Sequence, residues 1–218
     1  MTNITENVQR LLQELPAGTH LVAAVKTRTP AEITQALQAG IKILGENYVQ
    51  EAAQNHRVIG NLARWHFIGH LQKNKVKQAV EIFDLIETVD SLKIAQEIDK
   101  RCQLIGKIMP ILIEVNSGLE NQKSGVLPEN VAALAQSIAD LANIQLMGLM
   151  TMGPAVGNPE DSRPYFVTTR QVFTELQSLA IPNTTMQYLS MGMTNSYHVA
   201  LEEGANMVRL GTLIFGER

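Results

Sequence analysis

The chain alternates short, uninterrupted apolar runs with longer segments in which apolar residues recur at helical spacing. Leu21–Val25 is the first run, and it closes on Lys26. Runs that are apolar throughout, rather than at every second position, are typical of parallel strands buried on both faces of a sheet. Seven further strands are predicted at 41–45, 65–69, 82–89, 108–115, 144–150, 185–189 and 206–210. Helices are predicted between them, among them 46–58, 90–103, 128–142 and 165–180.

Eight strand–helix units predict a single (β/α)8 barrel of the TIM type, with residues 1–218 forming one domain. An open, doubly wound sheet would suit fewer units, and its glycine-rich phosphate fingerprints are missing from the sequence. An extra N-terminal helix over 4–15 is predicted before the barrel, since Asn3 and Glu6 resemble a capping box. Gly153–Pro164 is the longest irregular segment, and we expect it to form a loop over the barrel mouth.

Composition narrows the class of protein. Of the 218 residues, 18 are basic and 21 acidic, which gives a net charge of -3 and argues against binding to nucleic acid or acidic membranes. The only cysteine, Cys102, excludes a disulfide framework and a cysteine-rich metal site. No apolar run approaches the roughly 18 residues of a membrane span, and the N-terminus lacks the pattern of a signal peptide. A cytoplasmic protein is expected.

Lys26 is the first candidate for chemistry, because sites of such barrels form at the carboxyl ends of the strands. A lysine there can simply be solvated at the start of a loop. Alternatively, partial desolvation lowers its pKa and frees a neutral amine that can form a Schiff base. Its position alone leaves both interpretations open.

The next strand ends carry weaker signals. Gly45–Tyr48 is typical of a glycine turn before a helix. His66 and His70 are four residues apart, a spacing that suits a metal on a helix but not on a strand followed by a turn. We therefore predict no metal site, although one of the two histidines can face a ligand.

The last two strand ends carry the strongest local signal. Strand seven ends in Ser190–Thr194 and strand eight in Arg209–Thr212, and both segments contain glycine and a hydroxyl side chain. In barrels of this kind, phosphate groups often bind the loops after strands seven and eight. Each loop taken singly is also typical of an ordinary helix N-cap.

Several segments together resemble the pyridoxal phosphate homeostasis family, small single-barrel proteins similar to the N-terminal domain of bacterial alanine racemases. The segments run in order through nearly the whole chain: Ala24–Thr27, Gly45–Glu51, Trp65–Lys75, Gly148–Met152, Leu189–Met193 and Val208–Thr212. The third of them is the most specific. One departure follows the Ser-Met-Gly-Met motif, where the family commonly has a serine and aspartates and this chain has Thr194–Tyr197.

The resemblance implies a cofactor site. Lys26 would hold pyridoxal phosphate as an internal aldimine, and Arg209 would face the pyridine nitrogen. Asn47 would lie near the cofactor ring. The phosphate would be held by four residues of the last two strand ends, Ser190, Gly192, Gly211 and Thr212. No catalytic residue is assigned.

The implied site favours a carrier over an enzyme. Arginine cannot accept the pyridinium proton, so the ring opposite Arg209 would be a weak electron sink. The chain also ends shortly after strand eight, so we expect no second domain that would supply a partner base, and we expect a monomer. The favoured function is binding of pyridoxal phosphate and homeostasis of the vitamin B6 pool and of amino and keto acids, with apo forms of pyridoxal phosphate enzymes as partners. The alternatives are a small amino-acid racemase and a cofactor-free enzyme acting on a phosphorylated metabolite.

Overall fold

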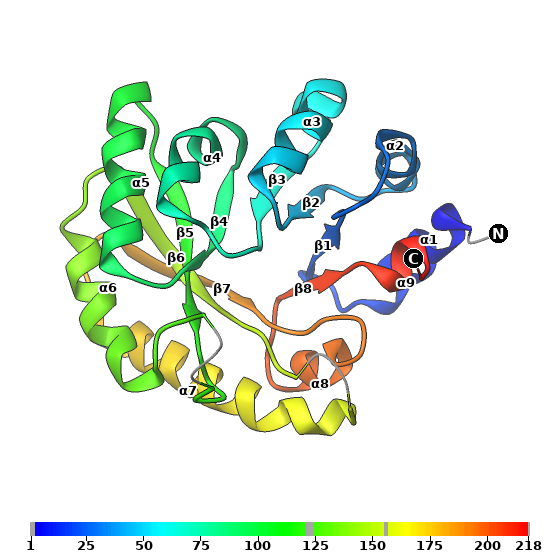
Figure 1. Ribbon diagram of the computed structural model, residues 1–218. Helices are drawn as coiled ribbons and strands as arrows, with labels where there is room; N and C mark the ends of the chain where they lie inside the picture. The colour runs from blue at the N-terminus through cyan, green and yellow to red at the C-terminus, as the bar shows by residue number, and fades with distance from the viewer. Residues whose placement is uncertain (1–2, 121–123, 155–156, 218) are drawn as a thin grey trace.

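Eight parallel strands close into a barrel in which each strand pairs with the next and β8 returns to β1 (Figure 1). The computed structural model describes residues 3–120, 124–154 and 157–217. The strands are β1 His20–Ala24, β2 Ile43–Glu46, β3 Arg64–Phe67, β4 Leu85–Val89, β5 Met109–Val115, β6 Ile144–Thr151, β7 Thr184–Ser190 and β8 Met207–Leu210. The predicted (β/α)8 barrel is confirmed.

Helices surround the barrel and connect its strands. They are α1 Ile4–Glu14, α2 Pro30–Gln38, α3 Val49–Ile59, α4 Val76–Ile82, α5 Leu92–Ile105, α6 Val131–Ala139, α7 Arg163–Leu179, α8 Tyr197–Glu202 and α9 Thr212–Phe215, with short 3-10 turns η1 Gly60–Leu62, η2 Lys73–Lys75, η3 Pro128–Asn130 and η4 Pro159–Ser162. In the described part of the chain, no helix is both long enough and apolar enough to span a bilayer.

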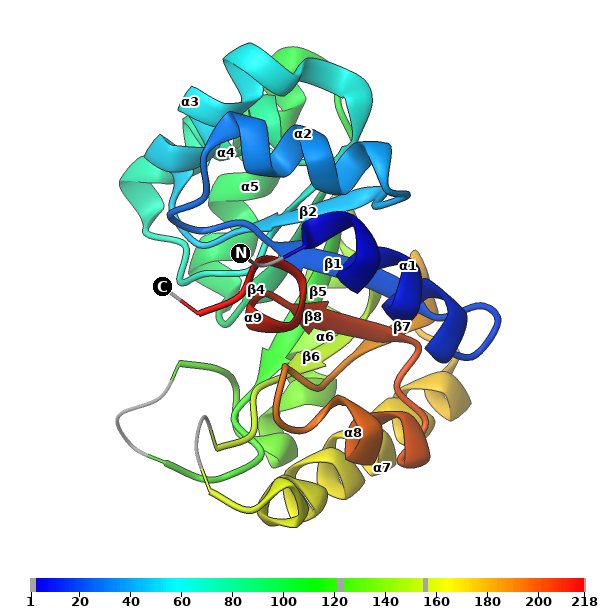
Figure 2. The same cartoon turned by 90° about the vertical axis from the view of Figure 1, so that its right-hand side faces the viewer.

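The extra N-terminal helix is confirmed and packs beside the last helix of the chain. Asn3 caps α1 by accepting a hydrogen bond from the Glu6 amide (3.2 Å). The Asn7 side chain donates to the Ile214 carbonyl of α9 (3.1 Å), and the views place α1 and α9 side by side (Figures 1 and 2). The two ends of the described chain therefore meet on one side of the barrel.

Apolar side chains fill both faces of the sheet. The larger core lies between the strands and the helices. Inside the barrel are two smaller clusters, one of Val22, Ile43, Ile68 and Met207 and one of Leu85, Leu112 and Met150, and the ring of Tyr188 packs against both. Because side chains alternate along a strand, residues two positions further toward the mouth face the same interior.

The seam between β7 and β8 has the fewest register pairs of the closed barrel. Ser190 and Met207 form the single register pair between these strands, whereas β8 and β1 share four. Three backbone hydrogen bonds cross the seam, from the Met191 amide to the Met207 carbonyl (3.0 Å), from the Asn206 amide to the Leu189 carbonyl (3.2 Å) and from the Arg209 amide to the Gly192 carbonyl (3.1 Å). The side chain of Asn206 adds two more. Its Oδ1 accepts from the Leu189 amide (2.8 Å), and its Nδ2 donates to the Gln187 carbonyl (2.7 Å).

Two predicted boundaries are wrong. Ile82 ends α4 instead of starting a strand, and β4 begins only at Leu85. The reason is Asp84, which interrupts the apolar run and accepts a hydrogen bond from the Trp65 amide of β3 (2.8 Å). Residues 155–156 of the expected loop Gly153–Pro164 lie outside the described residues, and in the rest of it residues 159–162 form η4 and α7 already starts at Arg163. The capping pair of Asn158 and Asp161 nucleates this early start.

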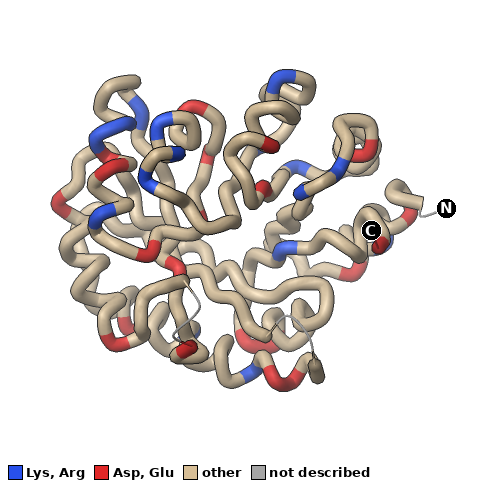
Figure 3. Tube along the Cα trace, in the orientation of Figure 1, with Lys and Arg blue, Asp and Glu red and all other residues tan. Residues whose placement is uncertain are grey.

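Acidic and basic residues are interspersed over most of the molecule (Figure 3). Lysines and arginines are frequent around η2, α4 and α5, where acidic residues also occur. Near η4 and α8, Arg163 pairs with Glu160, Glu202 and Glu203, each at 2.6 Å.

Candidate functional site

The carboxyl end of β1 brings Lys26 to the barrel mouth. The Val25 amide still donates to the Gly45 carbonyl (3.0 Å), so the pairing with β2 extends one residue beyond the strand. Val22 and Ala24 belong to an interior cluster, and Lys26 follows them at the same two-residue spacing. The side chain of Lys26 is half-buried, and within the described residues its amine has no hydrogen-bond or ion-pair partner.

The turn after Lys26 is strained and held from two sides. Thr27 has φ of 64°, a left-handed conformation that is a genuine outlier for a β-branched residue. Its amide donates to the Glu51 carboxylate of α3 (3.1 Å). The Arg28 guanidinium donates to the carbonyl of Gly216 (2.7 Å), next to α9, and stacks over Phe215. Both neighbours therefore fix the loop that carries the lysine.

The loops after β7 and β8 form a glycine-lined cradle next to β1. Gly192 has φ of 89°, and a Cβ there would lie 2.6 Å from the Cβ of Ala200. A Cβ on Gly211 would lie 3.3 Å from the Ala24 carbonyl oxygen, so the start of α9 almost touches the end of β1. Thr212, the first residue of α9, is exposed. Only glycine allows this close backbone approach at Gly192.

Ser190 lies beneath this cradle rather than in it. Its hydroxyl is fully buried and donates to Glu87 Oε2 (2.6 Å) while accepting from Arg209 Nη1 (2.5 Å). A hydroxyl has a single O–H donor, and here that donor points into the barrel. A contact between the Ser190 side chain and a phosphate stays a prediction, and the structure gives the hydroxyl another partner.

Arg209 is held in the barrel interior below the mouth. Its Nη2 donates to the Thr151 carbonyl (2.8 Å), and its Nη1 lies 3.8 Å from Glu87 Oε2. Burial lowers the pKa of Arg209, and the charges of Glu87 and Glu114 oppose that fall. Arginine remains protonated in proteins, so a fixed positive charge lies under the site.

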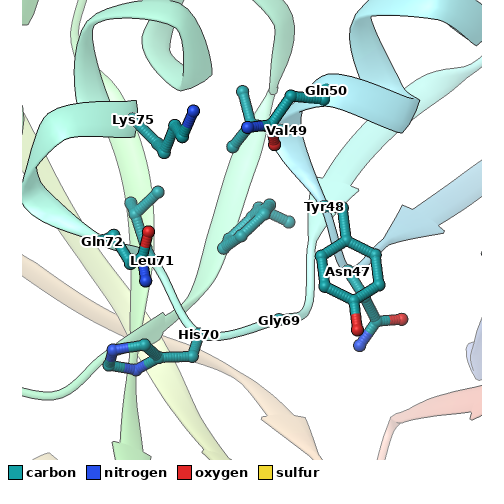
Figure 4. A pocket seen from close by; sticks show the side chains of 10 residues that line it. Asn47, Tyr48, Val49, Gln50, Gly69, His70, Leu71, Gln72 and Lys75 are labelled. Atoms are coloured by element: carbon teal, nitrogen blue, oxygen red, sulfur yellow. The ribbon is translucent and has the colours of Figure 1, made fainter.

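Asn47 lies on the other side of the mouth, at the end of β2. Its loop and the loop after β3 pack so closely that a Cβ on Gly69 would overlap the Asn47 carbonyl. A cavity of about 430 Å³ opens between these loops, and Figure 4 shows Asn47 and Tyr48 pointing away from Gln50 and Lys75. Within the described residues, the Asn47 side-chain amide has no hydrogen-bond partner and is available to a ligand.

The sequence-based prediction missed the acidic groups inside the barrel. Glu87 of β4 and Glu114 of β5 are both buried. Burial raises the pKa of Glu114 to about 7, with Asp90 adding to the rise and Arg209 opposing it. Each glutamate interrupts an otherwise apolar strand, two residues beyond an interior leucine. An acidic residue within an apolar strand was the signal in the sequence that could have identified these two glutamates as interior groups.

The two histidines at the end of β3 are separated by the structure. His66 is buried against Glu87, whereas His70 is exposed near Ser124 and Asp90. No group of three histidine, cysteine, aspartate or glutamate side chains suited to a metal occurs among the described residues. The departure at residues 194–197 also has a local role, because the Asn195 amide donates to the Gly157 carbonyl (3.0 Å) and a carboxylate could not.

Comparison with known proteins agrees with this geometry. Residues 1–218 match the family described as alanine racemase, N-terminal domain. A pyridoxal phosphate homeostasis protein of Aquifex aeolicus is 41% identical over 222 residues, covering 100% of this chain and 96% of the relative. One of Pasteurella multocida is 36% identical, with 100% and 96% covered.

Solved structures give the same picture. PipY of Synechococcus elongatus with PLP bound has a TM-score of 0.89 at 32% identity, covering 98% of this chain and 100% of PipY. An alanine racemase of Clostridium difficile has a TM-score of 0.84 at 16% identity, covering 99% of this chain and 57% of the racemase. The likeness to the racemase concerns the fold alone.

Proposed function

This chain belongs to the pyridoxal phosphate homeostasis protein family, and from that premise we propose that it binds pyridoxal phosphate at the barrel mouth and helps to maintain the cellular pool of this cofactor. One observation carries the proposal: Lys26, whose amine has no partner among the described residues, follows the end of β1 beside the glycine-containing loops after β7 and β8, and the barrel interior below holds the buried Arg209. The proposal treats residues 1–218 as one cofactor-binding barrel, active in the cytoplasm as a monomer. Apo forms of pyridoxal phosphate enzymes are the proposed recipients.

The residues present suit the chemistry of the cofactor. Lys26 offers a primary amine to the aldehyde. Gly192 and Gly211 would let backbone approach the phosphate, and Thr212 adds a hydroxyl that makes no hydrogen bond with any described residue. Arg209 would donate to the pyridine nitrogen, and Asn47 would contact the ring from the side of β2. The positive charge of Arg209 also suits an anionic ligand.

The same residues argue against robust catalysis. Pyridoxal phosphate, when bound, supplies a reactive aldehyde and a ring that withdraws electrons most strongly when its nitrogen is protonated. Arg209 only donates hydrogen bonds and cannot keep that nitrogen protonated. The carboxylate of Glu87, whose Oε2 lies 3.8 Å from Arg209 Nη1, is already bound to His66 and Ser190. We therefore propose a binding role without substantial turnover of amino acids.

A racemase remains a second candidate because of one observation. Glu114 lies on β5, opposite β1 in the closed barrel, and its pKa of about 7 would let it exchange protons near neutral pH. Lys26 and Glu114 could then act as two bases from opposite sides. Deuterium exchange at the α-carbon of an amino-acid panel, followed by proton NMR, separates the two functions. Exchange at enzyme-like rates that requires Lys26 would favour the racemase.

The cofactor proposal is tested by absorption spectroscopy. We expect wild-type protein incubated with pyridoxal phosphate to gain a visible band that borohydride reduction converts to a permanent adduct. Lys26→Ala should lack the band and keep the far-ultraviolet circular dichroism of the wild type. Lys75→Ala, which removes the lysine of the neighbouring cavity, is the matched control and should keep the band. A band of wild-type strength in Lys26→Ala would show that another lysine is used.

A further inference from the structure

We infer that Glu87, braced by His66, is the positioning residue that fixes Arg209 beneath the mouth of the barrel. The inference deepens the proposed function, because Arg209 is the group assigned to the pyridine nitrogen. It concerns two side chains, His66 and Glu87, to which that function assigns no task. Both come from the side of the barrel opposite Arg209 and meet it through the interior.

The contacts form one continuous chain across the barrel. His66 Nδ1 of β3 lies 2.8 Å from Glu87 Oε1 of β4. The other oxygen, Oε2, accepts from the Ser190 hydroxyl of β7 at 2.6 Å. That hydroxyl accepts in turn from Arg209 Nη1 of β8 at 2.5 Å. All four side chains are buried, so water does not compete for these hydrogen bonds.

Each oxygen of the Glu87 carboxylate therefore has a single task. A carboxylate only accepts hydrogen bonds, so Nδ1 of His66 carries a proton in this contact. Burial alone would raise the pKa of Glu87, but the hydrogen bond and charge of His66 and the charge of Arg209 hold it below the ordinary value. The residue is an anion that balances the buried arginine from within the protein.

Ser190 acts as the spacer in this arrangement. Arg209 Nη1 and Glu87 Oε2 are 3.8 Å apart, too far for a direct hydrogen bond, and the hydroxyl bridges them. The Thr151 carbonyl holds Nη2 at 2.8 Å. With one donor of each terminal nitrogen fixed, the guanidinium plane is set, and its remaining N–H groups are left for a ligand above.

Glu114 provides the matched comparison. It is a second buried glutamate whose charge acts on Arg209, but its carboxylate makes no hydrogen bond with the arginine among the described residues. If charge alone held Arg209, removing either acid would have the same effect. If the hydrogen-bonded chain positions it, only removal of Glu87 will release it.

The first experiment needs no cofactor. In nitrogen-15-labelled apo-protein, the Nε–H signal of Arg209 is identified by its loss in Arg209→Lys. We expect Glu87→Gln to move this signal and to accelerate its exchange with water at least about tenfold, whereas Glu114→Gln leaves the exchange within about twofold. An unchanged Arg209 signal in folded Glu87→Gln, or equal effects of both variants, would overturn the inference.

A second variant covers failure of Glu87→Gln to fold. His66→Gln keeps a donor for Glu87 but changes the brace, and we expect a smaller acceleration of the same signal. Wild-type exchange of Arg209 in that variant contradicts a role for His66 in the brace and overturns the inference as stated.

The last measurement links the arginine to the cofactor. With pyridoxal phosphate labelled at the ring nitrogen, we expect the nitrogen-15 shift of the bound ring to change in Glu87→Gln and to stay at the wild-type value in Glu114→Gln. An identical shift in all three proteins would show that the positioning does not reach the ring. Failure of the wild type to bind would refute the proposed function, while the test on the apo-protein would still decide the position of Arg209.

Discussion

Glu46 shows how a single buried acid makes stability depend on pH. One of its oxygens accepts from Asn55 (2.8 Å), and the other has no partner among the described residues. Burial raises its pKa to about 7, and Glu51 adds to the rise. Since the folded pKa exceeds the unfolded one, the stability it contributes is complete below about pH 4.5 and is lost as the pH rises through 7.

We therefore expect Glu46→Gln to flatten the pH dependence of unfolding. Each pKa unit corresponds to about 1.4 kcal/mol, so the wild type should lose up to about 3 kcal/mol between pH 4.5 and 8 that the variant keeps. Urea unfolding at pH 5 and pH 8 measures the difference. Glu129→Gln, on an exposed helix turn, is the control and should follow the wild type. Parallel curves for Glu46→Gln and wild type would contradict the shift.

The two hydroxyls of the phosphate site should respond differently to removal. Thr212→Ala should weaken the affinity for pyridoxal phosphate by about 1.5–3 kcal/mol and leave the melting temperature of apo-protein unchanged, because its side chain is exposed and has no hydrogen-bond partner in the part of the chain that the structure describes. Ser190→Ala should lower the melting temperature of apo-protein, since it leaves Glu87 and Arg209 without their bridge. Calorimetry and a cofactor titration measure both. If Ser190→Ala loses affinity for pyridoxal phosphate but melts like the wild type, the hydroxyl binds the phosphate and does not serve as a structural bridge.

Sequence patterns singled out candidate residues whose chemistry is visible locally, and their roles stay predictions. Lys26 and the glycines Gly192 and Gly211 stand directly after apolar runs, where a barrel collects its functional groups. Glu87 was missed because its partners His66 and Ser190 are 21 and 103 residues away in the chain and meet it only when the barrel forms. Periodicity says which side a residue faces, but it does not say what lies across the interior.

The turn between β1 and α2 stores strain next to the lysine. Thr27 keeps its left-handed φ because Glu51 holds its amide. We expect Glu51→Ala to release the turn and weaken the affinity of Lys26 for pyridoxal phosphate severalfold, as measured by the visible absorption band. Thr27→Gly in the same background should restore part of the affinity, because glycine adopts this conformation without strain. No recovery in the double variant would mean that Glu51 acts by another route.

The Asn206 side chain reinforces the backbone hydrogen bonds that join β7 and β8. Asn206→Ala leaves the Leu189 amide and the Gln187 carbonyl without their partner, and we expect a loss of about 2–3 kcal/mol in unfolding free energy. Asn206→Asp still accepts from Leu189 but cannot donate, so its loss should be smaller. Urea unfolding of the two variants gives the ranking, and equal stabilities of wild type and Asn206→Ala would show that the ladder closes without this residue.

Elements were easier to predict than their ends. All eight strands were located, most of them from apolar runs, because a parallel strand between two layers has no polar face. The strand β7 is the exception, since it mixes Thr and Gln with apolar residues and exposes alternate side chains. The run 82–89 contains the boundary between α4 and β4, which its apolar pattern does not reveal. Ile82 is the last residue of the helix, and only the contact of Asp84 with β3 shows where the strand begins. The spacing of apolar residues along the chain does not predict such long-range contacts.

At the scale of the whole molecule, α1 closes the fold by covering the last helix. Leu11 is fully buried on the inner face of α1. We expect Leu11→Ala to reduce the unfolding free energy by about 2–5 kcal/mol and to speed amide hydrogen exchange in α9. Leu12, exposed on the same helix, is the control position, and Leu12→Ala should change the stability by less than about 1 kcal/mol. Unchanged protection of α9 in Leu11→Ala would mean that the two helices are energetically independent.

The seam between β7 and β8 also bears on how long a ligand stays bound. Both loops proposed to hold the phosphate follow the two strands that share a single register pair. A phosphate held by both loops would bridge this seam, so we expect parting of β7 and β8 to loosen the phosphate, whereas a bond to Lys26 would still hold the other end of the ligand. If the chain stores and releases pyridoxal phosphate as proposed, the seam, joined by three backbone hydrogen bonds and the Asn206 side chain, is where the phosphate end can be freed first while the rest of the barrel stays closed.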